Sequence, residues 1–118
     1  MLKFYGHPTC TTCKKAEKWL DKNNREYEWI NIKETSPKKE WLRAILEDGL
    51  LTPKQIFNTS GKIYRELELK EKVEAMTTNE IVALLEGDGM MIRRPFITDE
   101  KNVSVGYNEE VFEELWGS

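Results

Sequence analysis

The hydrophobic positions of this chain alternate between the spacing of strands and the spacing of helices. An apolar run from Leu2 to Tyr5 opens the chain and predicts a first strand. In the following segment, 11–24, apolar positions recur three and four residues apart and predict a first helix. A second short strand is predicted by the β-like run Tyr27, Trp29, Ile30 and Ile32.

The middle of the chain carries the start and stop signals of helices. Ser36–Pro37 is expected to open a helix that Gly49 closes. The apolar stripe of that helix consists of Trp41, Leu42, Ile45 and Leu46. Thr52 and Gln55 then have the spacing of a capping box, and the segment Ile56–Ser60 is expected to be a short helix that ends near Gly61.

The last third predicts a helix, a hairpin and a final helix. A second capping-box pair, Thr77 and Glu80, precedes an apolar helix stripe. Phe96–Thr98 and Val103–Val105, separated by polar residues, predict a β-hairpin, and Asn108 is expected to cap the last helix. The order indicates an α/β fold. A right-handed βαβ unit with parallel strands gains antiparallel strands from the hairpin and forms a small mixed sheet covered by helices.

Composition narrows the class of protein. The chain has 118 residues, the length of one domain, and we expect a single domain over 1–118. No apolar run approaches the roughly 18 residues that span a membrane, so we expect a soluble, cytoplasmic protein without a membrane partner. With 18 basic and 21 acidic residues the net charge is −3, which argues against direct, non-specific nucleic-acid binding.

The two cysteines, Cys10 and Cys13, follow the first predicted strand and form a CxxC motif. Cys10 would lie at the amino end of the first helix, where unpaired backbone N–H groups and the helix dipole favour a thiolate. Lys14 and Lys15 add positive charge in the first turn. Such a setting lowers a cysteine pKa from about 8.5 by one to several units, so Cys10 is the candidate nucleophile.

Cys13 shares the apolar face of the first helix with Ala16 and Leu20, and we expect it to be the more buried, resolving sulfur. Three alternatives stay open. A structural disulfide across four residues gains only about 2 kcal/mol of chain entropy. A zinc site with His7 lacks a fourth ligand among histidines and cysteines, so we expect no metal. In the third alternative Cys13 is a small buried hydrophobe and Cys10 acts alone.

Two stretches carry a resemblance to a known family. The first combines Tyr5, Pro8, Cys10, Cys13, Lys14, Lys15 and Ala16, and the second is the late segment RRPFITDEKNVSVGYNEE. Together they resemble the ArsC-related proteins, and most of all the Spx and MgsR branch. The resemblance spans nearly the whole chain. It implies a thioredoxin- or glutaredoxin-like mixed sheet with a helical insertion, and a redox-active CxxC centre.

The resemblance also implies roles for individual residues. Pro95 is expected to be cis and to lie against the thiol site. Arg94 matches the arginine that contacts the oxyanion in ArsC-type arsenate reductases, with Arg93 beside it as support. Arg65 falls in the region of a second anion-binding arginine, although it equally suits a solvated ion pair with a neighbouring glutamate. Where those reductases carry a third arginine, this chain reads Val105-Gly106-Tyr107, so the three-arginine arsenate cradle is incomplete.

Two functions of different classes therefore remain open. One is a thiol–disulfide oxidoreductase that needs no bound cofactor and uses glutathione, glutaredoxin or thioredoxin as its redox partner. The other, implied by the Spx and MgsR branch, is a redox-sensing regulator that binds the RNA polymerase α subunit. Gly49 matches a glycine implicated in that contact, but the same glycine also suits a plain helix C-cap. We expect a monomer in either case.

Overall fold

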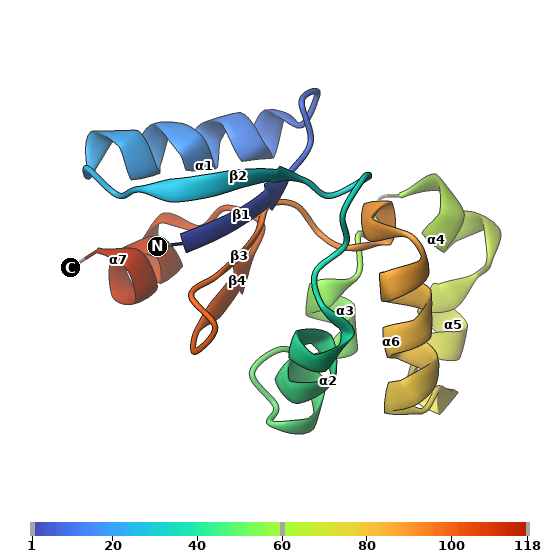
Figure 1. Cartoon of the computed structure of the whole chain (residues 1–118). Helices are drawn as coiled ribbons and strands as arrows, with labels where there is room; N and C mark the ends of the chain where they lie inside the picture. Colours follow the sequence, from blue (N-terminus) through green and yellow to red (C-terminus); the bar gives the residue numbers. More distant parts are fainter. Residues whose placement is uncertain (1, 60, 118) are drawn as a thin grey trace. The chain divides into compact units, whose positions relative to one another are not determined.

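The computed structural model describes residues 2–59 and 61–117, with the backbone alone at 62 and 63 (Figure 1). The chain divides into two compact units. Residues 1–31 and 94–118 form the first, which we call the sheet unit, and residues 32–93 form the second, which we call the helical unit. The helical unit is thus an insertion in the sequence of the sheet unit, as the ArsC-like fold class predicts.

The sheet unit contains a four-stranded mixed sheet in the order β2-β1-β3-β4. Its elements are β1 (Leu2–Gly6), α1 (Thr11–Lys22), β2 (Tyr27–Asn31), β3 (Phe96–Thr98), β4 (Val103–Val105) and α7 (Glu109–Trp116). β1 and β2 are parallel, whereas β3 is antiparallel to both β1 and β4. The predicted βαβ unit, hairpin and final helix are therefore confirmed.

The core of the sheet unit forms where α1 and α7 pack against the sheet. Phe4 of β1 and Ile97 of β3 are fully buried and meet Ala16 and Leu20 of α1. The ring of Trp19 lies edge-on to Phe112 of α7, with ring centroids 5.4 Å apart. The helical spacing of the apolar residues in α1 therefore identified its buried face correctly.

The helical unit is built from short helices joined by tight turns. Its elements are α2 (Lys39–Glu47), α3 (Pro53–Ile56), α4 (Lys62–Glu66), α5 (Leu69–Lys72), η1 (Val73–Ala75), α6 (Thr78–Gly87) and η2 (Gly89–Met91). Both predicted capping boxes are present, at the amino ends of α3 and α6. No helix within the described ranges is long and apolar enough to cross a membrane.

Two helix boundaries differ from the sequence-based expectations. α1 ends at Lys22 rather than Asn24, because Asn24 adopts a left-handed conformation with φ 57°. α2 begins at Lys39 rather than at Ser36–Pro37, and its N-cap, Lys38, makes no side-chain capping bond. Pro37 is buried instead, so it serves packing rather than helix initiation.

The expected helix Ile56–Ser60 is also wrong. α3 ends at Ile56, and Phe57 is extended and forms an isolated bridge with Ile92. Asn58 then donates its backbone N–H to Met91 O at 2.7 Å. These long-range partners draw the chain out of the helix, and Ser60 itself lies outside the described residues.

Candidate active site

Cys10 lies at the junction between strand β1 and helix α1. Its backbone N–H donates to His7 O at 3.1 Å, which closes the turn after Gly6. Cys10 is the N-cap of α1, and its Sγ accepts the backbone N–H of Cys13 at 3.2 Å. Because Cys10 is half-buried, its sulfur combines a hydrogen bond from the helix terminus with partial access to solvent.

Cys13 lies one turn further along α1 and is buried, with 1% of its surface exposed. Burial raises the pKa of the Cys13 thiol to about 12, and a side-chain hydrogen bond with Cys10 acts in the same direction. A backbone hydrogen bond from His7 and the charge of Arg94 favour the thiolate but are outweighed. Cys13 is therefore a protonated thiol at neutral pH, and the two cysteines have different environments.

Gly6 is a residue of this site that sequence reasoning missed. A Cβ at Gly6 would lie 2.7 Å from Cε1 of Phe4 and 3.3 Å from Sγ of Cys13. The lack of a side chain therefore allows the end of β1 to pass close to the buried sulfur. The sequence feature that could have indicated the role of Gly6 is its position between an apolar strand and the CxxC motif.

Arg94 and Pro95 reach the same end of the sheet from the far end of the sequence. Tyr5 of β1 pairs with Phe96 of β3, so Pro95 lies at the register position next to the carboxyl end of β1. The Arg94–Pro95 peptide bond is cis, as the family resemblance implies. Arg94 is half-buried with its Nε atom shielded from solvent, and its charge acts on Cys13.

The position of the missing third arginine is apolar. Tyr107 follows β4, and its ring packs edge-on against Phe112 of α7 at 5.0 Å between centroids. Gly106 before it has φ 73° and donates its N–H to Pro95 O at 3.0 Å. A tyrosine that packs against the core thus occupies the stretch where the family resemblance implies a third arginine in the reductases.

The other predicted site residues belong to the helical unit. Arg93 donates from Nε to Gln55 O at 3.0 Å and from Nη2 to Thr59 Oγ1 at 3.3 Å, so its guanidinium links α3 and the segment after it to the end of the unit. Arg65 lies on α4 and is exposed. Any contribution of these two arginines to the thiol site stays a prediction.

Gly49 has the geometry of a helix C-cap. Its φ is 70°, and its N–H donates to Leu46 O at 3.3 Å, while Leu50 N donates to Ile45 O at 3.0 Å. This is the hydrogen-bond pattern of a Schellman motif, in which glycine is favoured. Leu50 directly after it is 53% exposed, so the turn carries an apolar side chain in solvent.

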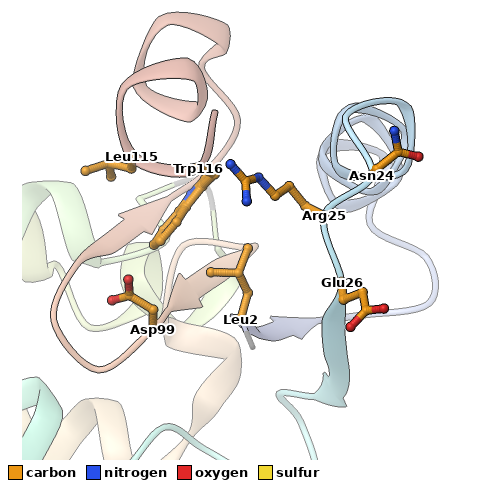
Figure 2. A pocket seen from close by; sticks show the side chains of 7 residues that line it. All are labelled: Leu2, Asn24, Arg25, Glu26, Asp99, Leu115 and Trp116. Carbon is orange, nitrogen blue, oxygen red and sulfur yellow. The ribbon is translucent and has the colours of Figure 1, made fainter. Parts of the chain in front are cut away.

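A hollow in the sheet unit lies away from the cysteines, and the described residues form no metal site. In residues 2–59 and 61–117 no group of three His, Cys, Asp or Glu side chains is arranged to hold a metal ion. His7 Nδ1 lies 2.9 Å from Thr9 Oγ1. The hollow has a volume of about 460 Å³, and in Figure 2 the side chains of Arg25 and Trp116 face one another across it. Its described lining residues are Leu2, Asn24, Arg25, Glu26, Asp99, Leu115 and Trp116.

A cysteine N-cap with a buried cysteine one turn later, at the carboxyl end of a strand in a β2-β1-β3-β4 sheet, defines a thioredoxin-like protein with a CxxC pair. The family model described as "ArsC family" matches residues 5–115. The chain therefore belongs to the ArsC family.

Individual relatives place the chain within this family. It is 50% identical over 115 residues to the uncharacterized protein YusI of Bacillus subtilis, and the match covers 98% of each chain. It is 33% identical to the regulatory protein MgsR of the same organism, over 91% of this chain and 83% of MgsR. It is 31% identical to the global transcriptional regulator Spx of Streptococcus agalactiae, over 93% of this chain and 79% of Spx.

A solved structure supports the same fold. The crystal structure of a possible arsenate reductase from Streptococcus mutans superimposes with a TM-score of 0.87 at 39% identity. The match covers 94% of this chain and 97% of that one. The ArsC-like thioredoxin fold expected from the two sequence stretches is confirmed.

Proposed function

We propose that this protein carries out thiol–disulfide exchange, with Cys10 as the attacking sulfur and Cys13 as the resolving sulfur. The observation that carries the proposal is the asymmetry of the pair. Cys10 is half-buried and accepts a helix-terminal N–H, whereas Cys13 is buried and has a pKa of about 12. The accessible sulfur is suited to meet a substrate, and the buried one to act only after an adduct has formed.

The exchange balances without a bound cofactor. The Cys10 thiolate attacks a substrate disulfide, forms a mixed disulfide and releases one substrate thiolate, which takes up a proton. Cys13 then loses its proton, attacks the Cys10 sulfur and releases the second substrate thiolate. The substrate disulfide is reduced by two electrons and the Cys10–Cys13 pair is oxidised to a disulfide. A thiol reductant such as glutathione or thioredoxin returns the pair to the dithiol.

The order of the two steps follows from the surroundings of Cys13. Both the hydrogen bond with Cys10 and the charge of Cys10 raise the pKa of Cys13. A mixed disulfide on Cys10 removes both causes, while the charge of Arg94 and the His7 backbone hydrogen bond still favour a Cys13 thiolate. Attack by Cys10 therefore makes Cys13 more acidic, and Arg94 has the additional role of orienting an anionic group of the substrate.

The direct test uses glutathione disulfide and mass detection. Cys13→Ser is expected to accumulate a stable glutathione adduct on Cys10, and the wild type is expected to convert to the Cys10–Cys13 disulfide with no lasting adduct. Cys10→Ser is the matched control and should form neither. Equal adducts on wild type and Cys13→Ser would show that Cys13 does not resolve.

Arg94 provides a second test of the same scheme. Arg94→Gln is expected to slow the resolving step, because it removes a charge that lowers the pKa of Cys13, whereas Arg94→Lys retains the charge. Single-turnover rates measured from pH 6 to 9 would show the difference as a shift of the profile to higher pH in Arg94→Gln alone. Identical profiles in both variants would remove Arg94 from the mechanism.

A redox-sensing regulator is the second candidate, and two observations favour it. The similarity to MgsR and Spx extends over 91% and 93% of this chain. The turn at Gly49 presents the exposed side chain of Leu50. In this alternative the Cys10–Cys13 disulfide alters binding to the RNA polymerase α subunit. The test measures how much purified α subunit the oxidised and the reduced protein capture, with Leu50→Glu as the surface variant. Equal capture in both states, or no capture in either, rejects the regulator.

A further inference from the structure

Helix α1 carries a continuous basic face. Lys14, Lys15, Lys18 and Lys22 are all exposed. At 3.6 residues per turn these four positions fall within an arc of about 100° on one side of the helix. The opposite side holds the buried residues Cys13, Ala16, Trp19 and Leu20. We call the four lysines the lysine face.

Among the residues that the structure describes, no lysine of this face forms an ion pair within 4 Å. The ion pair between Lys54 and Glu74, at 3.6 Å, belongs to the helical unit. The acidic residues of α1, Glu17 and Asp21, border this arc on one side, and their carboxylates accept the Tyr27 hydroxyl at 3.3 and 3.4 Å. The lysine face therefore presents four positive charges to solvent, with two carboxylates along one border.

The neighbouring helix limits the extent of this positive surface. α7 packs beside α1 through the Trp19–Phe112 contact and exposes four glutamates. These are Glu109, Glu110, Glu113 and Glu114. The surface charge thus changes from positive on α1 to negative on α7. A compact acidic patch fits such a surface better than an extended polyanion, whose charge would continue onto the acidic helix.

The lysine face begins directly behind the candidate nucleophile. With a rise of about 1.5 Å per residue, Lys14 lies about 6 Å and Lys22 about 18 Å along the helix axis from Cys10. A small disulfide that reaches Cys10 does not extend to Lys18 or Lys22. A macromolecule that reaches Cys10 from this side covers them.

We propose that the lysine face is a docking surface for a protein whose reactive disulfide is flanked by acidic side chains. This inference rests on the thiol–disulfide exchange proposed above and names the class of partner for it. The covalent step is the balanced exchange described there, with the partner disulfide reduced and the Cys10–Cys13 pair oxidised. The lysines accelerate encounter and orient the partner, and this effect is screened by salt.

The test uses three peptide disulfides on one scaffold. Each carries the same central disulfide and eight flanking residues, which are glutamates, serines or lysines. The second-order rate of mixed-disulfide formation with Cys10 is measured in Cys13→Ser at 20 mM and 300 mM salt. The acidic peptide is expected to react about tenfold faster than the serine peptide at low salt and within about twofold of it at high salt, with the basic peptide slowest.

Charge-reversal variants assign the preference to the lysine face. Lys18→Glu/Lys22→Glu, in the Cys13→Ser background, is expected to remove or invert the preference and to leave the rate with the serine peptide unchanged within about twofold. Lys18 and Lys22 are chosen because they lie further than Lys14 and Lys15 from the Cys10 sulfur. The matched control is Lys70→Glu/Lys72→Glu, which reverses two exposed lysines of α5 in the helical unit and should keep the preference.

The outcomes separate this inference from the function on which it rests. If the serine peptide forms no mixed disulfide with Cys10, the exchange function itself is rejected. If the serine peptide reacts but the acidic peptide has no advantage, or keeps its advantage in Lys18→Glu/Lys22→Glu, the docking surface is rejected and the exchange function stands. The proposal of an acidic protein partner would also be overturned by a third outcome. In that outcome a 20-nucleotide single strand binds the lysine face in a salt-dependent way, and the three peptides react at equal rates.

Discussion

The proton on Cys13 gives this protein a defined pH dependence at the residue scale. The folded-state pKa of Cys13 is raised to about 12, above the value of about 8.5 expected in the unfolded chain. A group of this kind contributes stability that is fully present below the unfolded pKa and is lost as the pH rises toward the folded pKa. The folded state therefore gains from the protonated thiol at neutral pH and loses that gain in alkali.

We expect the stability difference between Cys10→Ser and Cys10→Ser/Cys13→Ala to depend on pH. Only Cys13 distinguishes the two variants, and its burial, the largest cause of the shift, remains in Cys10→Ser. The difference should be constant below about pH 8 and smaller by about 2 kcal/mol at pH 10, as measured by urea unfolding under anaerobic conditions. A difference that stays constant from pH 7 to 10 would show that the Cys13 thiol titrates normally.

Two glycines of the helical unit make a matched pair for a stability test. A Cβ at Gly89 would overlap the carbonyl oxygen of Ile32, whereas a Cβ at Gly87 meets no atom within 4 Å. Gly89→Ala is expected to destabilise the protein by more than about 2 kcal/mol, because backbone must move. Gly87→Ala, at the last residue of α6, should be neutral or stabilising by up to about 1 kcal/mol. Thermal unfolding of both variants tests the contrast, and equal effects would contradict it.

At the scale of elements, the sequence predicted best where a helix start has a local chemical signature. The capping boxes at Thr52 and Thr77 are both present because each needs only residues within one turn. The end of α3 was predicted wrongly because its cause is non-local. Phe57 pairs with Ile92, more than thirty residues away, and no pattern near Phe57 indicates that bridge.

The cap at the start of α6 has a measurable energetic role. Thr77 Oγ1 accepts the Glu80 N–H at 3.2 Å, and Glu80 Oε1 accepts the Thr77 N–H at 3.0 Å. Thr77→Ala is expected to cost about 1 kcal/mol in the free energy of unfolding. Asn79→Ala, an exposed substitution in the same turn, is the control and should change stability by less than about 0.5 kcal/mol. Denaturant unfolding compares the two variants. Equal losses in the free energy of unfolding would show that the capping hydrogen bond does not stabilise the protein.

At the scale of the molecule, the CxxC motif and the late Arg-Pro segment were sufficient to predict the family and the fold. Cys10, Cys13, Arg94 and Pro95 belong to one unit of the structure, and the register of β1 with β3 explains why residues so distant in sequence meet at one sheet end. Gly6 was missed because its importance depends on the sulfur packed against it. The spacing of residues along the sequence does not indicate tertiary contacts of this kind.

Both cysteines are free in this structure, and we expect the fold not to depend on a disulfide between them. Closing a loop of four residues contributes only about 2 kcal/mol of chain entropy. We therefore expect reduction of the Cys10–Cys13 disulfide to shift the midpoint of thermal unfolding by less than about 10 °C and to leave a cooperative transition. Calorimetry with and without reductant measures the shift, and an unfolded reduced protein would refute this expectation.

The sulfur that caps α1 also links redox state to the backbone. The N–H of Cys13 lies in the first turn, where it has no partner within the helix, and Cys10 Sγ is its acceptor at 3.2 Å. A sulfur that enters a disulfide accepts hydrogen bonds more weakly than a thiolate does. Deuterium uptake at the Cys13 amide should therefore be faster in the oxidised protein than in the reduced one, while the Leu20 amide in the middle of α1 changes little. One amide proton, followed by NMR, would then report the redox state of the pair without any added probe.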